Sequence, residues 1–318
     1  MMKSSRSPFE YSNDNKRYHT LAYHFGQVFG GRMAKIPLYT GCTCPNRDGT
    51  KGVGGCTFCS GAGGAREAMN KSPLAEQYAC ERVSFAKKWP NTGFIAYFQS
   101  FTNTYLSLSS LKELVDEALA LPEIKGLAIA TRADCLSPEI ADYLAEISRK
   151  TWLSVELGLQ SVHDRTANNI NRCHNYAEFL RGYKLLKERG INVCVHLING
   201  LPGETPEMML ESAETVGRLK PHSVKLHMLH VVKETTLAKE YAAKSFPVLT
   251  REEYVQIICN QLEVLPPKTV IQRITGDPPA SELITPTWTL NKLWVRNAID
   301  MELARRGSMQ GIYYKENN

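Results

Sequence analysis

The chain has 318 residues, of which 43% are hydrophobic, enough to bury the core of one barrel-sized domain. Its formal net charge of +6 is a moderate basic excess, which favours a polyanionic partner without requiring one. Nine irregularly spaced cysteines, with neither a signal peptide nor an apolar run of about eighteen residues, argue against a disulfide-stapled secreted protein and a membrane-spanning one. We therefore expect a cytoplasmic protein without a membrane partner.

Residues 1–35 combine basic and aromatic side chains. The cations are Lys3, Arg6, Lys16, Arg17, Arg32 and Lys35, and the aromatic residues between them include Tyr11, Tyr18, Tyr23, Phe25 and Phe29. This composition is typical of a surface that follows phosphates and stacks on bases. An extension that packs its aromatic side chains onto the rest of the protein fits equally well. We expect 1–35 to be a basic aromatic extension.

Short apolar runs alternate with longer amphipathic stretches after this extension, a pattern typical of repeated βα units. Expected strands lie near 36–41, 94–100, 126–131, 152–158, 192–199 and 223–231, and expected helices near 74–88, 108–120, 138–149, 162–188, 207–219 and 250–264. Right-handed crossovers between parallel strands then predict the α/β class, with six units forming a barrel or part of one.

The end of the chain continues this pattern with one more strand at 269–274 and a helix near 287–306. We therefore divide the chain into the extension 1–35, a barrel core at 36–265 and a C-terminal extension at 266–318 that packs on the barrel. Cys80, Cys194 and Cys259 are expected in the core.

A glycine-rich loop after the first expected strand holds four cysteines: Cys42, Cys44, Cys56 and Cys59. Three thiolates, from Cys44, Cys56 and Cys59, would hold three irons of a 4Fe–4S cube and leave the fourth iron open to a small molecule. With Cys42 as a fourth ligand, the same segment suits a structural zinc. The residues alone leave both interpretations open.

Polar residues follow several expected strands at the point where each strand ends. They lie at 99–104, 131–134, 156–161 and 199–205. In parallel α/β barrels the carboxyl ends of the strands gather on one face, where the reactive groups lie. A shared pocket at that face is the expectation.

Three motifs resemble those of radical S-adenosylmethionine (radical SAM) enzymes: Cys44-Pro45-Asn46-Arg47-Asp48-Gly49-Thr50, Gly55-Cys56-Thr57-Phe58-Cys59 and Glu156-Leu157-Gly158-Leu159-Gln160-Ser161. The resemblance is closest to the YtqA/YhcC-type group, which is similar to the radical domain of the Elongator catalytic subunit. It implies a partial (β/α)6 TIM-like radical SAM barrel with short N- and C-terminal extensions. The spacing from Cys44 to Cys56 is longer than in the commonest signature, as it is in the Elongator-like pattern, and leaves Cys42 as an alternative to Cys44.

The resemblance also implies the cofactors, a 4Fe–4S cluster on Cys44, Cys56 and Cys59 and S-adenosylmethionine (SAM) on its open iron. The reduced cluster would cleave SAM to a 5′-deoxyadenosyl radical, with flavodoxin or ferredoxin as an electron donor. The implied SAM contacts are Gln99, Ser100, Thr102 and Asn103 at the methionine end, Arg172 at its carboxylate, Glu156 and Gln160 at the ribose, and Phe58 and Met228 at adenine. No further catalytic residue is identified.

The substrate expectation follows from the likeness to Elongator, whose radical domain acts on the wobble uridine of tRNA. It implies tRNA as partner and the C5 side chain of that uridine as the modified group, and the basic aromatic extension points the same way. Two alternatives stay open: a radical SAM enzyme acting on a small metabolite, and a zinc-stabilised RNA-binding barrel without redox chemistry.

Overall fold

The computed structural model describes residues 8–60, 72–90, 92–244 and 246–316, so Lys3 and Arg6 of the predicted extension lie outside the described residues. The chain forms two compact units. We call Phe25–Leu159 with Asn171–Cys194 the cysteine-loop unit, and Met1–His24, Gln160–Ile170 and Val195–Asn318 the C-terminal unit. Each unit is described by itself below.

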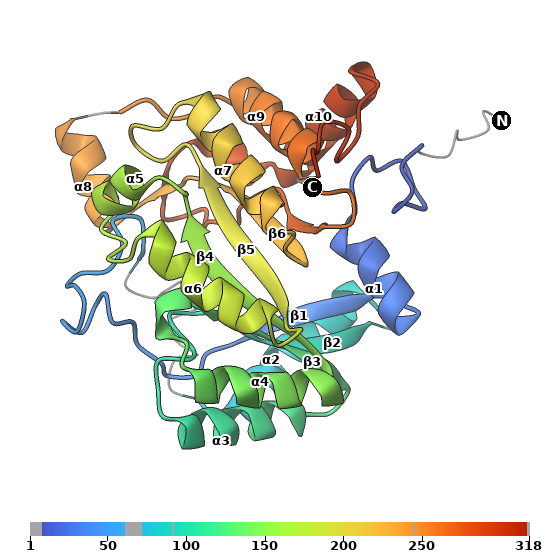
Figure 1. Ribbon diagram of the computed structural model, residues 1–318, viewed down its shortest axis with the longest axis vertical. Coiled ribbons are helices and arrows are strands. Elements are labelled where there is room, and N and C mark those ends of the chain that lie inside the picture. The colour runs from blue at the N-terminus through green and yellow to red at the C-terminus, as the bar shows by residue number, and fades with distance from the viewer. Residues whose placement is uncertain (1–7, 61–71, 91, 245, 317–318) are drawn as a thin grey trace. The chain divides into compact units, whose positions relative to one another are not determined.

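The main sheet has seven strands in the hydrogen-bonded order β1-β2-β3-β4-β5-β6-β8. Its first four strands are β1 (Met33–Leu38), β2 (Gly93–Phe98), β3 (Ile124–Thr131) and β4 (Trp152–Gln160), and each pairs in parallel with the next (Figure 1). The helices that alternate with them are α2 (Leu74–Lys88), α3 (Leu108–Leu119), α4 (Pro138–Lys150) and α6 (Tyr176–Lys187). This alternation confirms the predicted α/β class.

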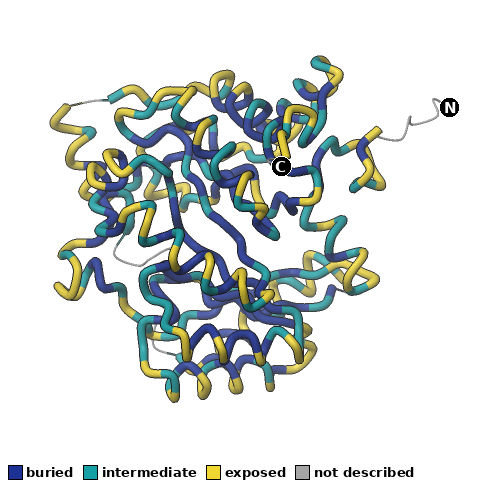
Figure 2. Tube along the Cα trace, in the orientation of Figure 1, coloured by how far each residue is buried: buried dark blue, intermediate teal, exposed yellow. Residues whose placement is uncertain are grey.

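Strands β2 and β4 are buried on both faces, as expected for a parallel sheet that helices cover. Figure 2 shows them in the buried colour, while the helices alternate between buried and exposed positions. Serine caps begin two helices, since the Ser107 and Ser137 hydroxyls accept from Ser110 N at 3.1 Å and Ile140 N at 3.3 Å. These caps orient α3 and α4 directly after the strand ends.

Helix α1 (Leu21–Phe29) and strand β5 (Asn192–Asn199) each start in one unit and end in the other, and the C-terminal unit contains further α-helices and strands. They are α5 (Asp164–Asn169), α7 (Pro206–Arg218), β6 (Ser223–Met228), β7 (Val231–Val232), α8 (Thr236–Ala243), α9 (Arg251–Val264), β8 (Val270–Arg273), β9 (Leu283–Thr285) and α10 (Lys292–Arg305). Strand β6 pairs in parallel with β8, β7 pairs antiparallel with β9, and α9 packs against α7 and α10.

The helix predicted at 162–188 is wrong as a single element, because the structure has α5 and α6 with a turn at 170–175 between them. Asn171 and Cys173 in this turn have positive φ angles of 51° and 54°, which a continuing helix cannot contain. Asn175 then starts α6 by a capping box with Glu178. Asn-x-x-Glu was the local signal for this new start, and the prediction overlooked it.

Several shorter features also differ from the expectation. Helix α1 (Leu21–Phe29), α8, β7 and β9 were not predicted. Cys194 and Cys259 are buried as expected, but Cys80 is exposed, because it lies on the outer side of α2. Among the described residues no helix is both long enough and apolar enough to cross a bilayer.

The described part of the N-terminal extension packs its aromatic side chains. Phe9, Tyr18 and Phe25 are only 4%, 4% and 2% exposed. Two of its cations bind the protein itself: Lys16 pairs with Asp300, and Arg17 donates to the Ser308 carbonyl at 3.3 Å. These residues therefore follow the second of the two sequence interpretations, an extension packed onto the protein.

Candidate functional site

The cysteine loop after β1 closes on itself. Gly55 N donates to the Asn46 carbonyl at 2.8 Å, and Lys51 N donates to the Pro45 carbonyl at 2.8 Å. Because these bonds return the chain to its starting point, Cys44 and Cys56 flank the base of the loop despite their wide spacing in the sequence. Cys59 follows in a tight turn.

The Cys56 sulfur receives two N–H donors. Asn46 Nδ2 and Arg172 Nη1 each lie 3.6 Å from Sγ, and Cys56 is 7% exposed. N–H donors to a sulfur are the kind of outer contact that orients a metal ligand.

The Cys59 thiol interacts electrostatically with two of its neighbours. Burial, and then the nearby Cys56 and Cys44 thiols, raise the pKa of Cys59 to about 11. Burial also raises the pKa of Cys42, but no cysteine contributes to that shift; the Thr40 hydroxyl opposes it. Cys44 and Cys56 therefore both lie near enough to Cys59 to affect its pKa. The choice of Cys44 over Cys42 as the first ligand stays a prediction.

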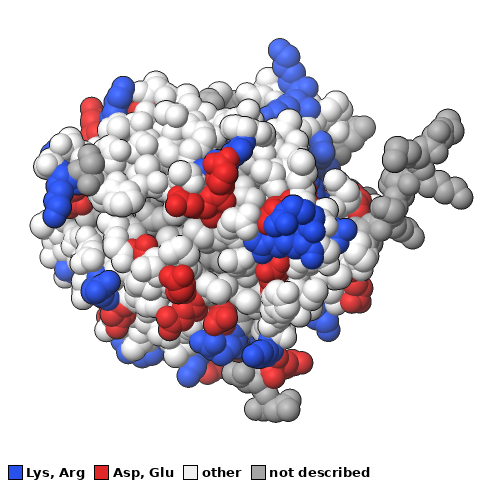
Figure 3. Space-filling view, turned by 90° about the horizontal axis from the view of Figure 1, so that it is seen from above, with Lys and Arg blue, Asp and Glu red and all other residues white. Residues whose placement is uncertain are grey.

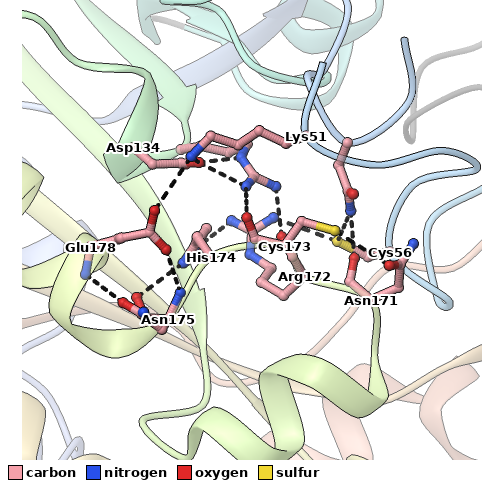
Figure 4. A network of polar contacts seen from close by, with 12 residues as sticks. Lys51, Cys56, Asp134, Asn171, Arg172, Cys173, His174, Asn175 and Glu178 are labelled. Atoms are coloured by element: carbon pink, nitrogen blue, oxygen red, sulfur yellow. Dashed lines mark hydrogen bonds and ion pairs between the residues drawn. The ribbon is translucent and has the colours of Figure 1, made fainter. Parts of the chain in front are cut away.

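Arg172 lies beside this group, in the turn between α5 and α6 (Figure 4). It is 6% exposed, and its Nη2 donates to the Gly158 carbonyl of β4. Its buried Nε has no hydrogen-bond partner among the residues that the structure describes. A buried cation with an unused donor is costly unless an anionic ligand completes it. Three thiols and this arginine fit a 4Fe–4S cluster with the carboxylate of SAM.

The loop after β2 approaches the cysteine loop, since Thr102 N donates to the Thr43 carbonyl at 3.2 Å. Ser100, Thr102 and Asn103 are buried, whereas Gln99 is exposed. The Asn103 amide nitrogen donates to three backbone carbonyls, those of Phe98, Ser100 and Ala130, at 2.8–3.1 Å. Asn103 therefore fixes this loop, and its amide has no donor left for a ligand.

Glu156 of β4 is fully buried and accepts from Lys35 Nζ at 2.6 Å and from the Tyr97 hydroxyl at 2.7 Å. A buried carboxylate needs a cationic or hydrogen-bonding partner, but the sequence analysis did not identify Lys35 as that partner. The signal was a lysine inside the otherwise apolar strand Met33–Leu38. The predicted ribose contact of Glu156 stays a prediction.

The three other predicted cofactor residues are placed as follows. Phe58 is half-buried between Cys56 and Cys59 in the chain. Gln160 ends β4 with a positive φ of 76°, and Met228 ends β6, where its sulfur accepts from Gly276 N at 2.8 Å. Gln160 and Met228 belong to the C-terminal unit. The contacts of all three with SAM stay predictions.

Two sequence families match the chain in succession. The Radical SAM superfamily matches residues 41–216, more than half of the chain, and the Radical_SAM C-terminal domain matches residues 221–305. The uncharacterized protein YtqA of Bacillus subtilis is 46% identical over 97% of this chain and 96% of its own length. Protein YhcC of Escherichia coli is 36% identical over 88% of this chain and 90% of its own length.

The chain is also partly similar to a tRNA uridine(34) acetyltransferase and, in its fold, to a solved Elp3 structure. The tRNA uridine(34) acetyltransferase of Methanocaldococcus infernus is 27% identical over 50% of this chain and 30% of its own length. The solved structure of Elp3 from the same archaeon, truncated at its N-terminus, superposes with a TM-score of 0.67 at 18% identity, covering 87% of this chain and 64% of that one. The structural likeness supports the fold.

These matches confirm the resemblance inferred from the cysteine and strand motifs. They also confirm the partial TIM-like barrel and the cofactors of this family, a 4Fe–4S cluster and SAM. The zinc-stabilised barrel without redox chemistry is overturned by the same matches. The chain belongs to the radical SAM superfamily and, within it, is similar to YtqA and YhcC.

Proposed function

We propose that this radical SAM enzyme modifies tRNA, at the C5 side chain of the wobble uridine, with its cluster held by Cys44, Cys56 and Cys59. When bound, the reduced cluster supplies the electron that cleaves SAM and so generates a hydrogen-abstracting radical. The observation that carries the cofactor part is the buried Arg172, whose Nη1 contacts Cys56 Sγ while its Nε is left for a ligand.

The chain's own residues hold and orient the cofactors in this proposal. Arg172 binds the carboxylate of SAM, and the buried Ser100 and Thr102 line its methionine end. Gln99 and Asn103 belong to the same loop, Gln99 exposed and Asn103 as its backbone clamp. Lys35 and Tyr97 fix the orientation of the Glu156 carboxylate, which we assign to the ribose of SAM.

The tRNA substrate is supported by relatives. Half of this chain is similar in sequence to an enzyme named for uridine 34 of tRNA, and the fold is similar to that of Elp3. The net charge of +6 agrees with a polyanionic partner. An electron donor such as flavodoxin or ferredoxin would reduce the cluster.

A small-metabolite substrate is the second candidate. It is favoured by the ion pairs that several basic residues form with acidic residues of the protein itself. Lys16 and Lys35 are paired with Asp300 and Glu156, and Arg306 contacts Glu263 at 3.1 Å. On the face in Figure 3, basic and acidic side chains are interspersed over the described residues. These cations are therefore engaged within the protein.

The deciding experiment starts with protein purified without oxygen. We expect about four irons per chain and SAM cleavage to 5′-deoxyadenosine after reduction, because a 4Fe–4S cluster is the family's electron source. Mass spectrometry of tRNA nucleosides, from cells with and without the gene, then tests the substrate. A uridine derivative lost with the gene and restored by the wild-type gene, but not by Cys59→Ala, supports tRNA. An unchanged nucleoside profile, with SAM cleavage intact, favours the small metabolite.

A further inference from the structure

The turn that carries Arg172 is held in an unfavourable backbone conformation. The residues on both sides of it, Asn171 and Cys173, have positive φ angles, which are unfavourable for residues other than glycine. Such a conformation persists only where the surroundings impose it. The contacts that impose it therefore determine where the Arg172 guanidinium lies.

One set of contacts comes from Arg132, at the end of β3. Its Nη1 donates to the Arg172 carbonyl at 2.9 Å, and its Nη2 donates to the Cys173 carbonyl at 3.2 Å. Arg132 is only 2% exposed. A planar guanidinium can bind two successive carbonyls in this way while keeping donors for a carboxylate, and a lysine ammonium lacks this geometry.

That carboxylate is Asp134, which Arg132 binds through Nε and Nη2, both at 2.9 Å. The Asp134 side chain is 4% exposed. Arg132 and then Lys51 hold the pKa of Asp134 well below its usual range against the effect of burial. The carboxylate is therefore ionised and fixes the plane of the Arg132 guanidinium.

Asp134 also reaches the cysteine loop, because Lys51 Nζ lies 2.6 Å from its Oδ2 (Figure 4). On the other side of Arg172, Asn171 Nδ2 donates to the Val53 and Gly55 carbonyls of the same loop at 3.2 and 2.8 Å. The turn and the cysteine loop are thus connected on both sides of Arg172. Neither Arg132 nor Asp134 is a cluster ligand in this arrangement.

We propose that Arg132 and Asp134 are positioning residues that set the Arg172 guanidinium against the cluster loop, so that it binds the SAM carboxylate. This inference rests on the proposed role of the cluster and Arg172 and is independent of the substrate. Outer residues that orient a metal-site ligand typically affect affinity or activity by about 10- to 100-fold. Loss of the positioning weakens SAM binding and leaves the cysteines in place.

The test compares Arg132→Lys with the wild-type holoenzyme, each loaded anaerobically with its cluster and reduced with dithionite. SAM cleavage to 5′-deoxyadenosine is measured against SAM concentration and needs no tRNA. We expect the KM for SAM to rise about tenfold or more with a smaller change in kcat and unchanged iron content. The electron paramagnetic resonance spectrum of the reduced cluster should shift on SAM addition only at correspondingly higher SAM concentration.

Arg189→Lys is the matched control, since Arg189 belongs to the same unit and contacts Asp142, whose side chain is 64% exposed, at 2.7 Å. It should leave the KM for SAM unchanged. Lys51→Gln is the second variant should Arg132→Lys fail to fold, because Lys51 is partly exposed and its loss leaves the Arg132–Asp134 contact intact. For it we expect roughly a two- to five-fold rise in KM.

The outcomes separate this inference from the proposed function. If the KM for SAM is unchanged in both Arg132→Lys and Lys51→Gln, the positioning role is wrong. Loss of iron from Arg132→Lys also overturns it, because that result would assign Arg132 to cluster assembly. A wild-type protein that binds no cluster and cleaves no SAM overturns the proposed function itself. A raised KM with normal iron supports the inference even if tRNA proves not to be the substrate.

Discussion

Lys35 of β1 and Glu156 of β4 form an ion pair inside the cysteine-loop unit, with Nζ and Oε1 2.6 Å apart. Strands β2 and β3 separate these two strands in the sheet, so no backbone hydrogen bond joins them. The Tyr97 hydroxyl of β2 donates to the same carboxylate. Lys35 also lies 5.4 Å from the centroid of the Tyr97 ring, which favours its charge. The contact therefore ties strands together across the sheet through side chains.

Lys35→Met should destabilise the protein strongly. The substitution leaves the Glu156 carboxylate buried without its cation, and breaking a buried pair in this way costs about 3–5 kcal/mol. Urea unfolding followed by circular dichroism measures the change in the free energy of unfolding.

The double variant Lys35→Met with Glu156→Gln is the control for this prediction. The amide keeps an acceptor for the Tyr97 hydroxyl and removes the unpaired charge, so the double variant should recover about 2 kcal/mol relative to Lys35→Met alone. Equal losses in the two variants would mean that packing, and not charge, causes the destabilisation.

The cysteine group makes a prediction about iron content. Cys56→Ala and Cys59→Ala should abolish cluster binding, because each removes one of the three thiolates proposed to hold the cluster. Cys42→Ala should retain about four irons, since the three proposed ligands Cys44, Cys56 and Cys59 remain. Iron analysis and the visible absorption of anaerobic protein measure this.

Cys80→Ala, at an exposed site on α2, is the control for the cysteine series and should leave iron content unchanged. Loss of the cluster from Cys42→Ala, together with a harmless Cys44→Ala, would identify Cys42 as the first ligand and contradict our assignment.

Local patterns were enough to predict most of the sheet and its helices. Helix α4 lies within one residue of the helix predicted at 138–149, because its apolar residues recur on one face and Ser137-Pro138 marks its start. The capping box of Asn175 and Glu178 is a local signal for the start of α6, but the conformation of the turn before it depends on long-range hydrogen bonds of Arg132 and Asn171. Periodicity carries no information about such long-range contacts.

For the candidate site too, the sequence predicted which residues take part but not the long-range contacts between them. Spacing and glycine content singled out the cysteines, and a strand-end position singled out Arg132 and Asp134 as polar residues. The sequence could not show that Arg132 donates hydrogen bonds both to Asp134 and to the turn that carries Arg172. It also could not distinguish aromatic residues that stack on bases from those, such as Tyr18, that are buried within the protein.

His174 makes stability depend on pH. Burial, followed by the charge of Arg172, lowers its pKa to about 3, while Asp134 opposes the shift. The unfolded chain binds a proton near pH 6.5 and the folded protein does not, so this contribution is complete above pH 6.5 and is lost as the pH falls toward 3. Between pH 7 and pH 5 it lowers the free energy of unfolding by about 2 kcal/mol.

His174→Phe should flatten this dependence, because phenylalanine takes up no proton on unfolding. Urea unfolding of both proteins at pH 7 and pH 5 gives the comparison, and the difference between the two pH values should be about 2 kcal/mol smaller in the variant. Identical pH dependence in the two proteins would show that the pKa of His174 is the same in the folded and unfolded states.

Gly182 in α6 lies directly against the backbone of Ala133, the residue between Arg132 and Asp134. A Cβ added at Gly182 would overlap the Ala133 carbonyl, which is backbone and cannot rotate away. Gly182→Ala should therefore destabilise the protein by about 1–3 kcal/mol, although alanine in a helix is normally favoured over glycine by about 1 kcal/mol. Because α6 begins directly after the Arg172 turn, the variant should also raise the KM for SAM.

Gly26→Ala in α1 is the matched comparison, since a Cβ there meets nothing within 4 Å. This variant should stabilise the protein by up to about 1 kcal/mol through helix propensity alone. Thermal unfolding and SAM cleavage are measured on both variants. The comparison separates the effect of helix propensity on stability from the effect of the close contact between Gly182 and Ala133. If Gly182→Ala gains stability as Gly26→Ala does, α6 can move away from Ala133 without cost, and the contact between them does not hold the turn in place.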